Sequence, residues 1–134
     1  MDMHAKITAF LSSPAFGVLG ASTHREKYGN KVLRCYLQHH RLVYPLNPHA
    51  DEIEGISVIK KIADLPDTVK SISIITPPNV TEELVKEAIA KNIKNIWMQP
   101  GAESEAAIQE CIKHHINVIA GGICILVVMN FHEA

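Results

Sequence analysis

Short apolar runs alternate with amphipathic helical patterns along most of this chain of 134 residues. Five runs have the composition of buried strands: AFGVLG (15–20), RLVYPL (41–46), SISIIT (71–76), NIWMQ (95–99) and NVIAG (117–121). Helical patterns separate them over residues 29–39, 80–91 and 103–114, with a shorter helical piece over 58–65. Strands that alternate with helices of this length predict right-handed crossovers and a mostly parallel sheet covered on both faces. We therefore expect an α/β fold, doubly wound, as one domain over residues 1–134.

The two ends of the chain are less regular. Apolar residues in MHAKITAFL (3–11) predict a helix that stops before Pro14, so that residues 1–13 form an N-terminal helix packed on the domain. The C-terminal run CILVVMNF (124–131) is compatible with a sixth strand or with a buried tail. The sheet is then expected to have five or six strands, with the single tryptophan, Trp97, in the core.

Three predicted helices pass into the next strand within one or two residues. Such a change usually needs a residue with positive φ after the helix, most often glycine. The candidates here are His40, Asn92 and His115, whose residue types are enriched at positive φ among non-glycines. The pairs of adjacent histidines that end two of these helices are then better explained as caps and surface residues than as metal ligands, because neighbours in sequence point away from each other on a helix. We expect no metal site.

Composition argues against several classes of function. A net charge of −1 gives no broad electrostatic footprint for nucleic acid or for an anionic membrane. The three cysteines have no C-x-x-C spacing, which suits a reducing cytoplasm, and the N-terminus lacks the layout of a signal peptide. The most apolar stretch, VIAGGICILVVMNF, contains two glycines and is too short to span a bilayer. We expect a cytoplasmic domain without nucleic-acid or membrane partners.

In open α/β sheets, ligands bind beyond the carboxyl ends of the strands. The first loop at this edge begins with Gly20, which lets a ligand approach the backbone, and continues with Ala21 and Ser22, which offer backbone N–H groups and a hydroxyl. The start of the next helix, near Gly29, adds oriented donors for an anion. A tight strand-to-helix turn without a ligand explains this loop equally well. The dinucleotide pattern G-x-G-x-x-G is absent, since the glycines lack its spacing.

The other loops at this edge are rich in proline and amide residues. The second strand ends in YPLNP, where an NAD-binding half usually carries an acid for the ribose hydroxyls, so Asn47 makes NAD less favoured. In the third loop Pro77 and Pro78 cannot donate backbone hydrogen bonds, so they form a rigid apolar wall or simply end the strand. Asn79 or Thr81 is expected to cap the helix that follows.

Sequence motifs of catalysis are missing from this chain. It has no G-x-x-x-x-G-K-[ST], no G-x-S-x-G and no H-E-x-x-H. Cys124, which follows two glycines near the expected site, is the best candidate for a reactive thiol, although a buried structural thiol is the favoured explanation. We expect no catalytic residues.

Several segments together carry a family resemblance: GASTHREKYGNKVLRCYL (20–37), VYPLNP (43–48), EIEG (52–55), ADLP (63–66) and WMQPGAE (97–103). They resemble the small CoA-binding domain proteins of bacteria and archaea. That family is similar to the N-terminal CoA-binding domain of the succinyl-CoA synthetase α-subunit and of ADP-forming acyl-CoA synthetases. The likeness covers about residues 16–128, and its most specific pieces are G-A-S followed by K-Y-G-N-K, and Y-P-x-N-P. It implies a Rossmann-like sheet with strand order 3-2-1-4-5 and a ligand between the first and fourth strands.

The resemblance implies that coenzyme A, or an acyl-CoA, is the ligand. Its diphosphate is expected against the first loop, its nucleotide end near the second loop, and its adenosine or the start of its pantetheine arm along the third loop, with the fourth loop farther along. In that order the residues are Gly20, Ala21 and Ser22, closed by Lys27, Tyr28 and Gly29; Asn47 and Pro48; Thr76, Pro77 and Pro78; and Gln99, Pro100 and Gly101.

This sequence departs from the family pattern in three places. Relatives often carry a basic residue after N-P, a partner for the 3′-phosphate, whereas His49 and Ala50 follow here. Related chains often read D-G-P-C or D-R-C near the end, where this chain reads GGIC. The synthetase α-subunit's second domain, with its phosphorylated histidine, has no counterpart in the sequence, so we expect no ligation by this chain alone.

The first hypothesis is therefore non-catalytic binding of coenzyme A or an acyl-CoA. The first alternative is an NAD(H)- or flavin-dependent enzyme or sensor. The second alternative is an interaction module with a vestigial nucleotide pocket, which pairs with itself as a homo-oligomer or with a larger protein that handles acyl-CoA.

Overall fold

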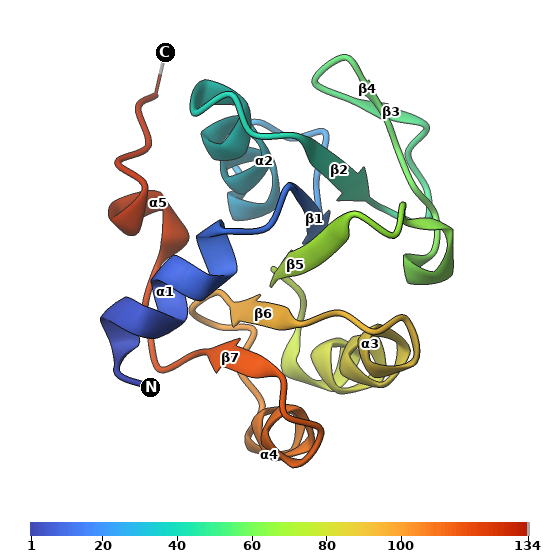
Figure 1. Cartoon of the computed structure of the whole chain (residues 1–134). Helices are drawn as coiled ribbons and strands as arrows, with labels where there is room; N and C mark the ends of the chain where they lie inside the picture. Colours follow the sequence, from blue (N-terminus) through green and yellow to red (C-terminus); the bar gives the residue numbers. More distant parts are fainter. Residues whose placement is uncertain (134) are drawn as a thin grey trace.

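A computed structural model describes residues 1–133 of the chain (Figure 1). The helices are α1 (Met3–Leu11), α2 (Tyr28–Gln38), α3 (Pro78–Ala90), α4 (Glu105–Lys113) and α5 (Ile125–Val128), with a 3₁₀ turn, η1 (Ile62–Asp64). The strands are β1 (Ala15–Leu19), β2 (Val43–Leu46), β3 (Glu52–Ile53), β4 (Ile56–Ser57), β5 (Val69–Ile74), β6 (Asn95–Met98) and β7 (Asn117–Ile119). The α/β class and the five predicted strands are confirmed.

Five strands form one sheet in the order β2-β1-β5-β6-β7, and every pair in it is parallel. Counted among the five predicted strands this order is 2-1-3-4-5, so the predicted order 3-2-1-4-5 is wrong. The third predicted strand, β5, pairs with β1 and lies in the centre of the sheet. The reason lies in the crossover from β2 to β5: its Ile62 and Leu65 pack with α3 and α4, on the face opposite α2. A right-handed crossover on that opposite face carries the chain back past β1.

Helices cover both faces of the sheet, as Figure 1 shows. On one face α1, α2 and α5 pack over a cluster that contains Phe10, Phe16, Tyr36 and Trp97. Trp97 is fully buried and meets Phe10 edge-on with the ring centroids 5.2 Å apart, which confirms its predicted place in the core. On the other face α3, α4 and η1 cover the second half of the core. Every residue of β1 and β6 is buried, and all of them but Asn95 are apolar, as expected of strands covered on both faces.

Three predicted details differ in the structure. The C-terminal run forms no sixth strand within the described residues; it contains the short helix α5, which buries Ile125. The helical piece expected over 58–65 is reduced to η1, and a hairpin of β3 and β4 precedes it. Its two-residue turn places both Glu54 (φ 51°) and Gly55 (φ 79°) in the left-handed region, a turn type that normally favours Asn-Gly or Asp-Gly. Because Glu54 is not a usual residue for the first position of this turn, the sequence pattern did not indicate the hairpin.

Residues with positive φ follow three helices, as predicted. The φ angles of His40, Asn92 and His115 are 55°, 64° and 59°. In each case the next residue donates its N–H back to the carbonyl five residues earlier, for example Ile116 to Cys111 at 2.8 Å. This is the Schellman arrangement, in which glycine is the usual residue because the left-handed region strains a side chain that has a Cβ.

We predict that His115→Gly stabilises the protein. Relief of left-handed strain favours the folded state by more than glycine's extra freedom favours the unfolded one, so the free energy of unfolding should rise by roughly 0.5–1 kcal/mol. Urea unfolding measures the change. The control is His114→Gly, whose φ of −98° offers no strain to relieve and whose ring nitrogen contacts the Glu110 carbonyl, so this variant should lose stability. Equal effects of both substitutions would contradict the prediction.

Candidate functional site

The sheet reverses its order between β1 and β5, because β1 is followed in the chain by β2 on one side and β5 by β6 on the other. Ligands of open α/β sheets bind at this point, beyond the carboxyl ends of the strands. The predicted gap between the first and fourth strands is thus replaced by the gap between β1 and β5. The first and third predicted loops leave the sheet at this point, one after Leu19 and the other after Ile74.

Two glycines allow the first loop to lie against its neighbours. Gly20 has a φ of 93°, and a Cβ there would stand 2.3 Å from the carbonyl oxygen of Ile75. A Cβ on Gly29, in the first turn of α2, would stand 2.0 Å from the carbonyl oxygen of Gly20. Both positions therefore exclude any side chain. The start of α2 is held directly over the end of β1, which is the geometry expected of an anion-binding loop.

Most of the predicted site residues lie around three adjoining cavities at this edge. The polar cavity, of about 490 Å³, is lined by Gly20, Ala21, Ser22, Glu26, Lys27, Tyr28, Gly29, Asn47 and Ile75. The apolar cavity, of about 220 Å³, is lined by Leu19, Gly20, Leu46, Asn47, Pro48, Lys60, Lys61, Ile62, Thr76, Val80, Leu84 and Glu87. The proline cavity, of about 320 Å³, is lined by Ile75, Thr76, Pro77, Pro100, Gly101 and Ala102. Gly20 and Asn47 are shared by the polar and apolar cavities, Ile75 by the polar and proline cavities, and Thr76 by the apolar and proline cavities.

Two predicted site residues do not line these cavities. Pro78 is the first residue of α3, so neither Asn79 nor Thr81 caps that helix as predicted; proline is well tolerated at this position because its missing N–H would have no helical partner. Gln99 is 2% exposed and points away from the three cavities. Its Oε1 accepts from the Ile125 N–H at 2.8 Å, so it fixes the start of α5.

Asn47 lies in the site but has a structural task. Its Nδ2 donates to the Ala21 carbonyl at 2.8 Å, and its Oδ1 accepts from the N–H groups of His49 and Ala50 at 2.7 and 2.9 Å. The amide therefore ties the second loop to the first and closes its own turn. The polar atoms expected to face a nucleotide are already in use.

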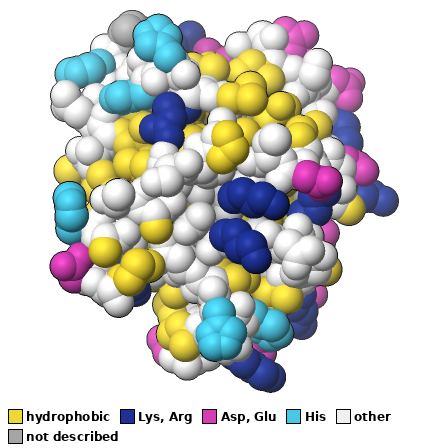
Figure 2. All heavy atoms as spheres, viewed as in Figure 1, with side chains coloured by type: hydrophobic (Ala, Val, Ile, Leu, Met, Phe, Trp, Pro, Cys, Tyr) yellow, Lys and Arg dark blue, Asp and Glu magenta, His cyan; other side chains and the backbone are white. Residues whose placement is uncertain are grey.

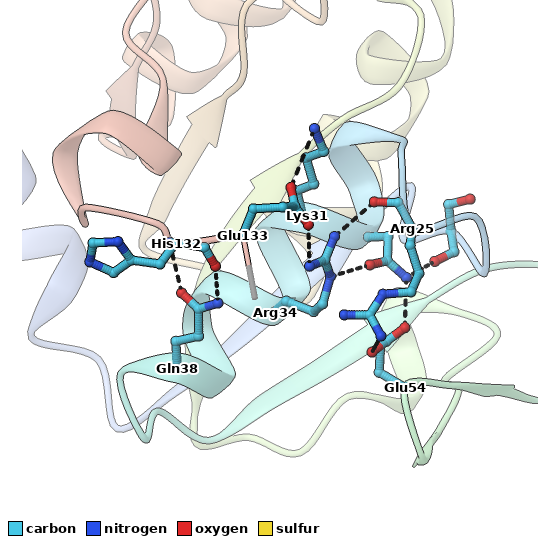
Figure 3. A network of polar contacts seen from close by, with 9 residues as sticks. Arg25, Lys31, Arg34, Gln38, Glu54, His132 and Glu133 are labelled. Carbon is cyan, nitrogen blue, oxygen red and sulfur yellow. Dashed lines mark hydrogen bonds and ion pairs between the residues drawn. The ribbon is translucent and has the colours of Figure 1, made fainter.

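A buried network holds the first loop from the other side (Figure 3). Asn30 is fully buried in α2 and donates through Nδ2 to the Ser22 carbonyl at 2.9 Å. Arg34, one turn later and 5% exposed, donates through Nε to the Asn30 Oδ1 at 2.7 Å and through Nη2 to the Arg25 carbonyl at 2.8 Å. Two loop carbonyls are thus turned inward toward α2, which sets the conformation of the loop between them.

The same network reaches two distant parts of the chain. Asn30 also donates to Glu54 of the β3–β4 hairpin at 3.1 Å, and Glu54 pairs with Arg25. Arg34 donates to Glu133 near the C-terminus at 2.6 Å, and this hydrogen bond lowers the pKa of Glu133. Figure 3 shows these side chains converging on Arg34 and Arg25. The β3–β4 hairpin and the C-terminal segment therefore both supply side chains that help to fix the conformation of the first loop.

The backbone N–H groups at the start of α2 are not capped by a side chain of the described residues. Within residues 1–133, no side chain caps this helix, because its N-cap residue Lys27 makes no side-chain hydrogen bond to the first turn. In contrast, Ser104 accepts from Ala107 at the start of α4. The uncapped end of α2 faces the polar cavity through Lys27, Tyr28 and Gly29. It offers an anion both N–H donors and the positive end of the helix dipole.

The fourth and fifth loops are tied together by one carboxylate. Glu103 accepts from the Gly101 N–H at 2.8 Å and from the Gly122 N–H at 2.9 Å. Partial burial acts to raise the pKa of Glu103, but these backbone donors outweigh it and the net effect lowers the pKa. Gly101 therefore contributes shape to the proline cavity, since its N–H is occupied.

Burial suppresses the reactivity of two cysteines. Burial, with a smaller contribution from Cys124, raises the pKa of Cys35 to about 11, and burial raises that of Cys111 to about 12. Both thiols stay protonated near neutral pH and are poor nucleophiles. Cys124 is half-buried behind Gln99, whose Nε2 lies 3.4 Å from its Sγ.

Lys60 and Lys61 are lining residues that sequence reasoning missed. They come from the segment between β4 and η1 and bring two positive charges to the apolar cavity. The dipeptide KK after a short apolar run was visible in the sequence, but nothing local indicated that the hairpin would turn it back toward the end of β2.

Charge on the rest of the surface is mixed. Figure 2 shows Lys and Arg side chains in ones and twos among acidic, histidine and uncharged groups on the face that it displays. None of the helices described between residues 1 and 133 combines the length and the apolar character needed to cross a bilayer. In the same residues no group of three or more His, Cys, Asp or Glu side chains is placed to hold a metal ion.

An open, doubly wound parallel sheet with a glycine-containing loop and a helix start at its switch point is the architecture of nucleotide-binding domains. The chain belongs to the CoA-binding domain family: the family model described as a CoA binding domain matches residues 15–130. The resemblance found in the sequence is therefore confirmed.

Individual relatives agree with this assignment. The chain is 28% identical to an ADP-forming acetate–CoA ligase of Methanocaldococcus jannaschii over 98% of its own length, but it spans only 19% of that ligase. A conserved hypothetical protein from Pyrococcus furiosus has a similar structure, with a TM-score of 0.81, 37% identity, and coverage of 85% of this chain and 97% of that one. The dinucleotide-forming acetyl-coenzyme A synthetase 1 of Ca. Korarchaeum cryptofilum is similar over 82% of this chain and 26% of its own, with a TM-score of 0.73 and 27% identity.

We predict that Asn30→Ala loosens the first loop. It removes the donor to Ser22 and leaves the buried Nε of Arg34 without its acceptor, so the free energy of unfolding should fall by roughly 1–3 kcal/mol. Hydrogen exchange should quicken in the backbone of residues 22–25. The control Asn79→Ala removes an exposed amide and should change stability by less than about 0.5 kcal/mol. Unchanged exchange in 22–25 would show that the loop does not depend on the network.

A second prediction concerns acid pH. The folded-state pKa of Glu103 lies below its ordinary value of 4.5, so its stabilising effect is complete above that value and disappears as pH falls through the lowered folded-state pKa. Glu103→Gln should therefore cost roughly 1 kcal/mol near neutral pH, after allowance for solvent screening, and progressively less in acid. Urea unfolding at several pH values, from neutral into acid, measures whether the free energies of unfolding of the native protein and of Glu103→Gln converge. The control Glu52→Gln, an exposed carboxylate of β3, should show neither effect.

Proposed function

We propose that this chain binds coenzyme A, or an acyl-CoA, along the carboxyl edge of its sheet without catalysing a reaction by itself. The observation that carries the proposal is the set of three adjoining cavities of different chemistry, in which the polar cavity shares lining residues with both of the others. Coenzyme A needs an apolar place for its base, donors for its diphosphate, and an exit for its pantetheine arm.

The polar cavity suits the diphosphate. Its lining includes Gly20, Ala21 and Ser22, and the uncapped start of α2 faces it. Lys27 adds a positive charge at the same helix end, beside the carboxylate of Glu26 in the same lining. Backbone donors, a helix dipole and one cation are together a common solution for a phosphate in a chain with almost no net charge.

The two remaining cavities suit the two ends of the ligand. The apolar cavity between β2 and α3 presents Leu46, Val80 and Leu84, apolar side chains against which a base can pack. The proline cavity meets the polar cavity at Ile75 and leads past Pro77 and Pro100, whose lack of N–H groups makes an inert wall for an aliphatic arm. Membership of the CoA-binding domain family supports coenzyme A as the ligand.

The lining chemistry supports binding over catalysis. Among the described residues, the linings of the three cavities contain no histidine and no cysteine, the side chains that most often supply acid–base or nucleophilic groups near neutral pH. The Methanocaldococcus jannaschii ligase to which this chain is similar is about five times its length, as the 19% coverage shows. We infer that acyl transfer, where it occurs, uses groups outside the three cavities.

Isothermal titration calorimetry with coenzyme A tests the proposal, with NAD and FMN as competing ligands. We predict a dissociation constant in the micromolar range for coenzyme A. Ser22→Ala should weaken binding by roughly 1 kcal/mol, about fivefold, for one lost hydrogen bond. The matched control is Thr23→Ala, the next residue, which lies outside the cavity linings and should leave binding unchanged.

Two results would contradict the proposal. Binding of NAD or FMN with none of coenzyme A would favour a nucleotide-dependent enzyme or sensor. No heat with any of the three ligands, from protein that is folded by circular dichroism, would favour an interaction module.

A further inference from the structure

The wall of the apolar cavity nearest to β2 carries two ammonium groups, those of Lys60 and Lys61. The remaining charged residue of its lining is Glu87 of α3, so the lining has a net charge of +1. An apolar cavity for a base needs no cations of its own. Two adjacent lysines at its mouth therefore point to an anionic substituent on the same ligand.

The backbone around these lysines is held at both sides. Just before them, the Ile59 N–H donates to the Pro45 carbonyl at 2.9 Å, and the Ile59 carbonyl accepts from the Asn47 N–H at 3.3 Å. Ile59 thereby forms a parallel bridge with Leu46, the last residue of β2. Just after them, Ile62 is 1% exposed in the core. The positions of the lysines are fixed by the fold even though their side chains are exposed.

Neither ammonium group has a strong partner in the protein. Lys60 contacts the Ala50 carbonyl and pairs with Asp51 at 3.1 Å, but the Asp51 side chain is 97% exposed, so the pair is weak. The Lys61 side chain makes no hydrogen bond or ion pair with any residue from 1 to 133, although its backbone carbonyl accepts from the Asp64 N–H. The charge of Lys61 is thus unpaired and that of Lys60 only weakly paired, so both can meet a dianion.

The position of Lys60 and Lys61 beside the end of β2 indicates which part of the ligand they contact. In dinucleotide-binding halves of this architecture the end of the second strand carries an acid, which accepts from the ribose hydroxyls. Here that end carries Asn47, whose amide is used within the protein, and beside it stand two cations. His49, next along the chain, does not line the cavity. A ribose at this position meets ammonium groups where other chains offer a carboxylate.

We infer that Lys60 and Lys61 bind a phosphate carried on the ribose, so that the site selects a ribose-phosphorylated adenine nucleotide over its dephosphorylated form. This inference rests on the proposed function, in which that phosphate is the 3′-phosphate of coenzyme A. The cations then come from the segment between β4 and η1, about a dozen residues beyond the N-P dipeptide.

The test compares coenzyme A with 3′-dephospho-coenzyme A by calorimetry. The native protein should bind coenzyme A more tightly by roughly tenfold or more, as expected for charge-assisted hydrogen bonds. In Lys60→Gln/Lys61→Gln this ratio should fall to near one, with the affinity for the dephosphorylated ligand retained. Lys61→Gln alone, which breaks no side-chain hydrogen bond or ion pair among residues 1–133, should lower the ratio without any loss of thermal stability.

The matched control is Lys94→Gln/Lys113→Gln, which removes the same charge at exposed positions outside the three cavities and should keep the native ratio. Equal affinities for the two ligands in the native protein would overturn the inference and leave the proposed function standing. An affinity ratio that keeps its native value in Lys61→Gln and in Lys60→Gln/Lys61→Gln would also overturn the inference and leave the proposed function standing. Failure of both ligands to bind would overturn the proposed function itself, and the inference with it.

Discussion

The close contact of backbone with backbone at the switch point is the constraint on which the rest of the site depends. Gly20 lies against the Ile75 carbonyl, and Gly29 lies against the carbonyl of Gly20, with no room for a Cβ at either position. The end of β1, the start of α2 and the distant segment that follows β5 therefore converge within a few ångströms. That convergence places the uncapped start of α2 over the end of β1, and it leaves the polar cavity beside the apolar one.

Glycines permit this arrangement, but side chains select it. A loop with two glycines loses much conformational freedom on folding, so something must favour one conformation over the others. Two amide side chains do so: the half-buried Asn47 holds the Ala21 carbonyl, and the buried Asn30 holds that of Ser22. Arg34 donates both to Asn30 and to Glu133, and it thereby connects the Asn30 amide to the C-terminal segment. Since all these partners are satisfied, the buried polar groups specify the loop without leaving an unpaired charge.

Part of this structure could be predicted from the sequence, and the missing part has a physical explanation. The alternation of apolar runs and helical patterns gave the α/β class, and the carboxyl-edge rule located the loops. Strand order failed because an apolar run shows that β5 is buried on both faces without showing which neighbour it pairs with. Gln99 was misplaced because a loop position does not say where its side chain points. Lys60 and Lys61 were missed because they depend on a hairpin whose turn contains Glu54 at positive φ.

The residues of the site divide into those that the fold needs and those that it does not. Gly20, Gly29 and Asn30 are buried or sterically enclosed, so a change there disturbs the backbone before it alters recognition. Exposed side chains at the cavity mouths, such as Lys61, contribute little to stability because water already solvates them. Their position is nevertheless fixed, because Ile59 and Ile62 anchor the backbone on either side. Recognition at the ribose end can therefore change by substitution of surface charge alone, while the loop that holds the diphosphate stays as the fold requires it.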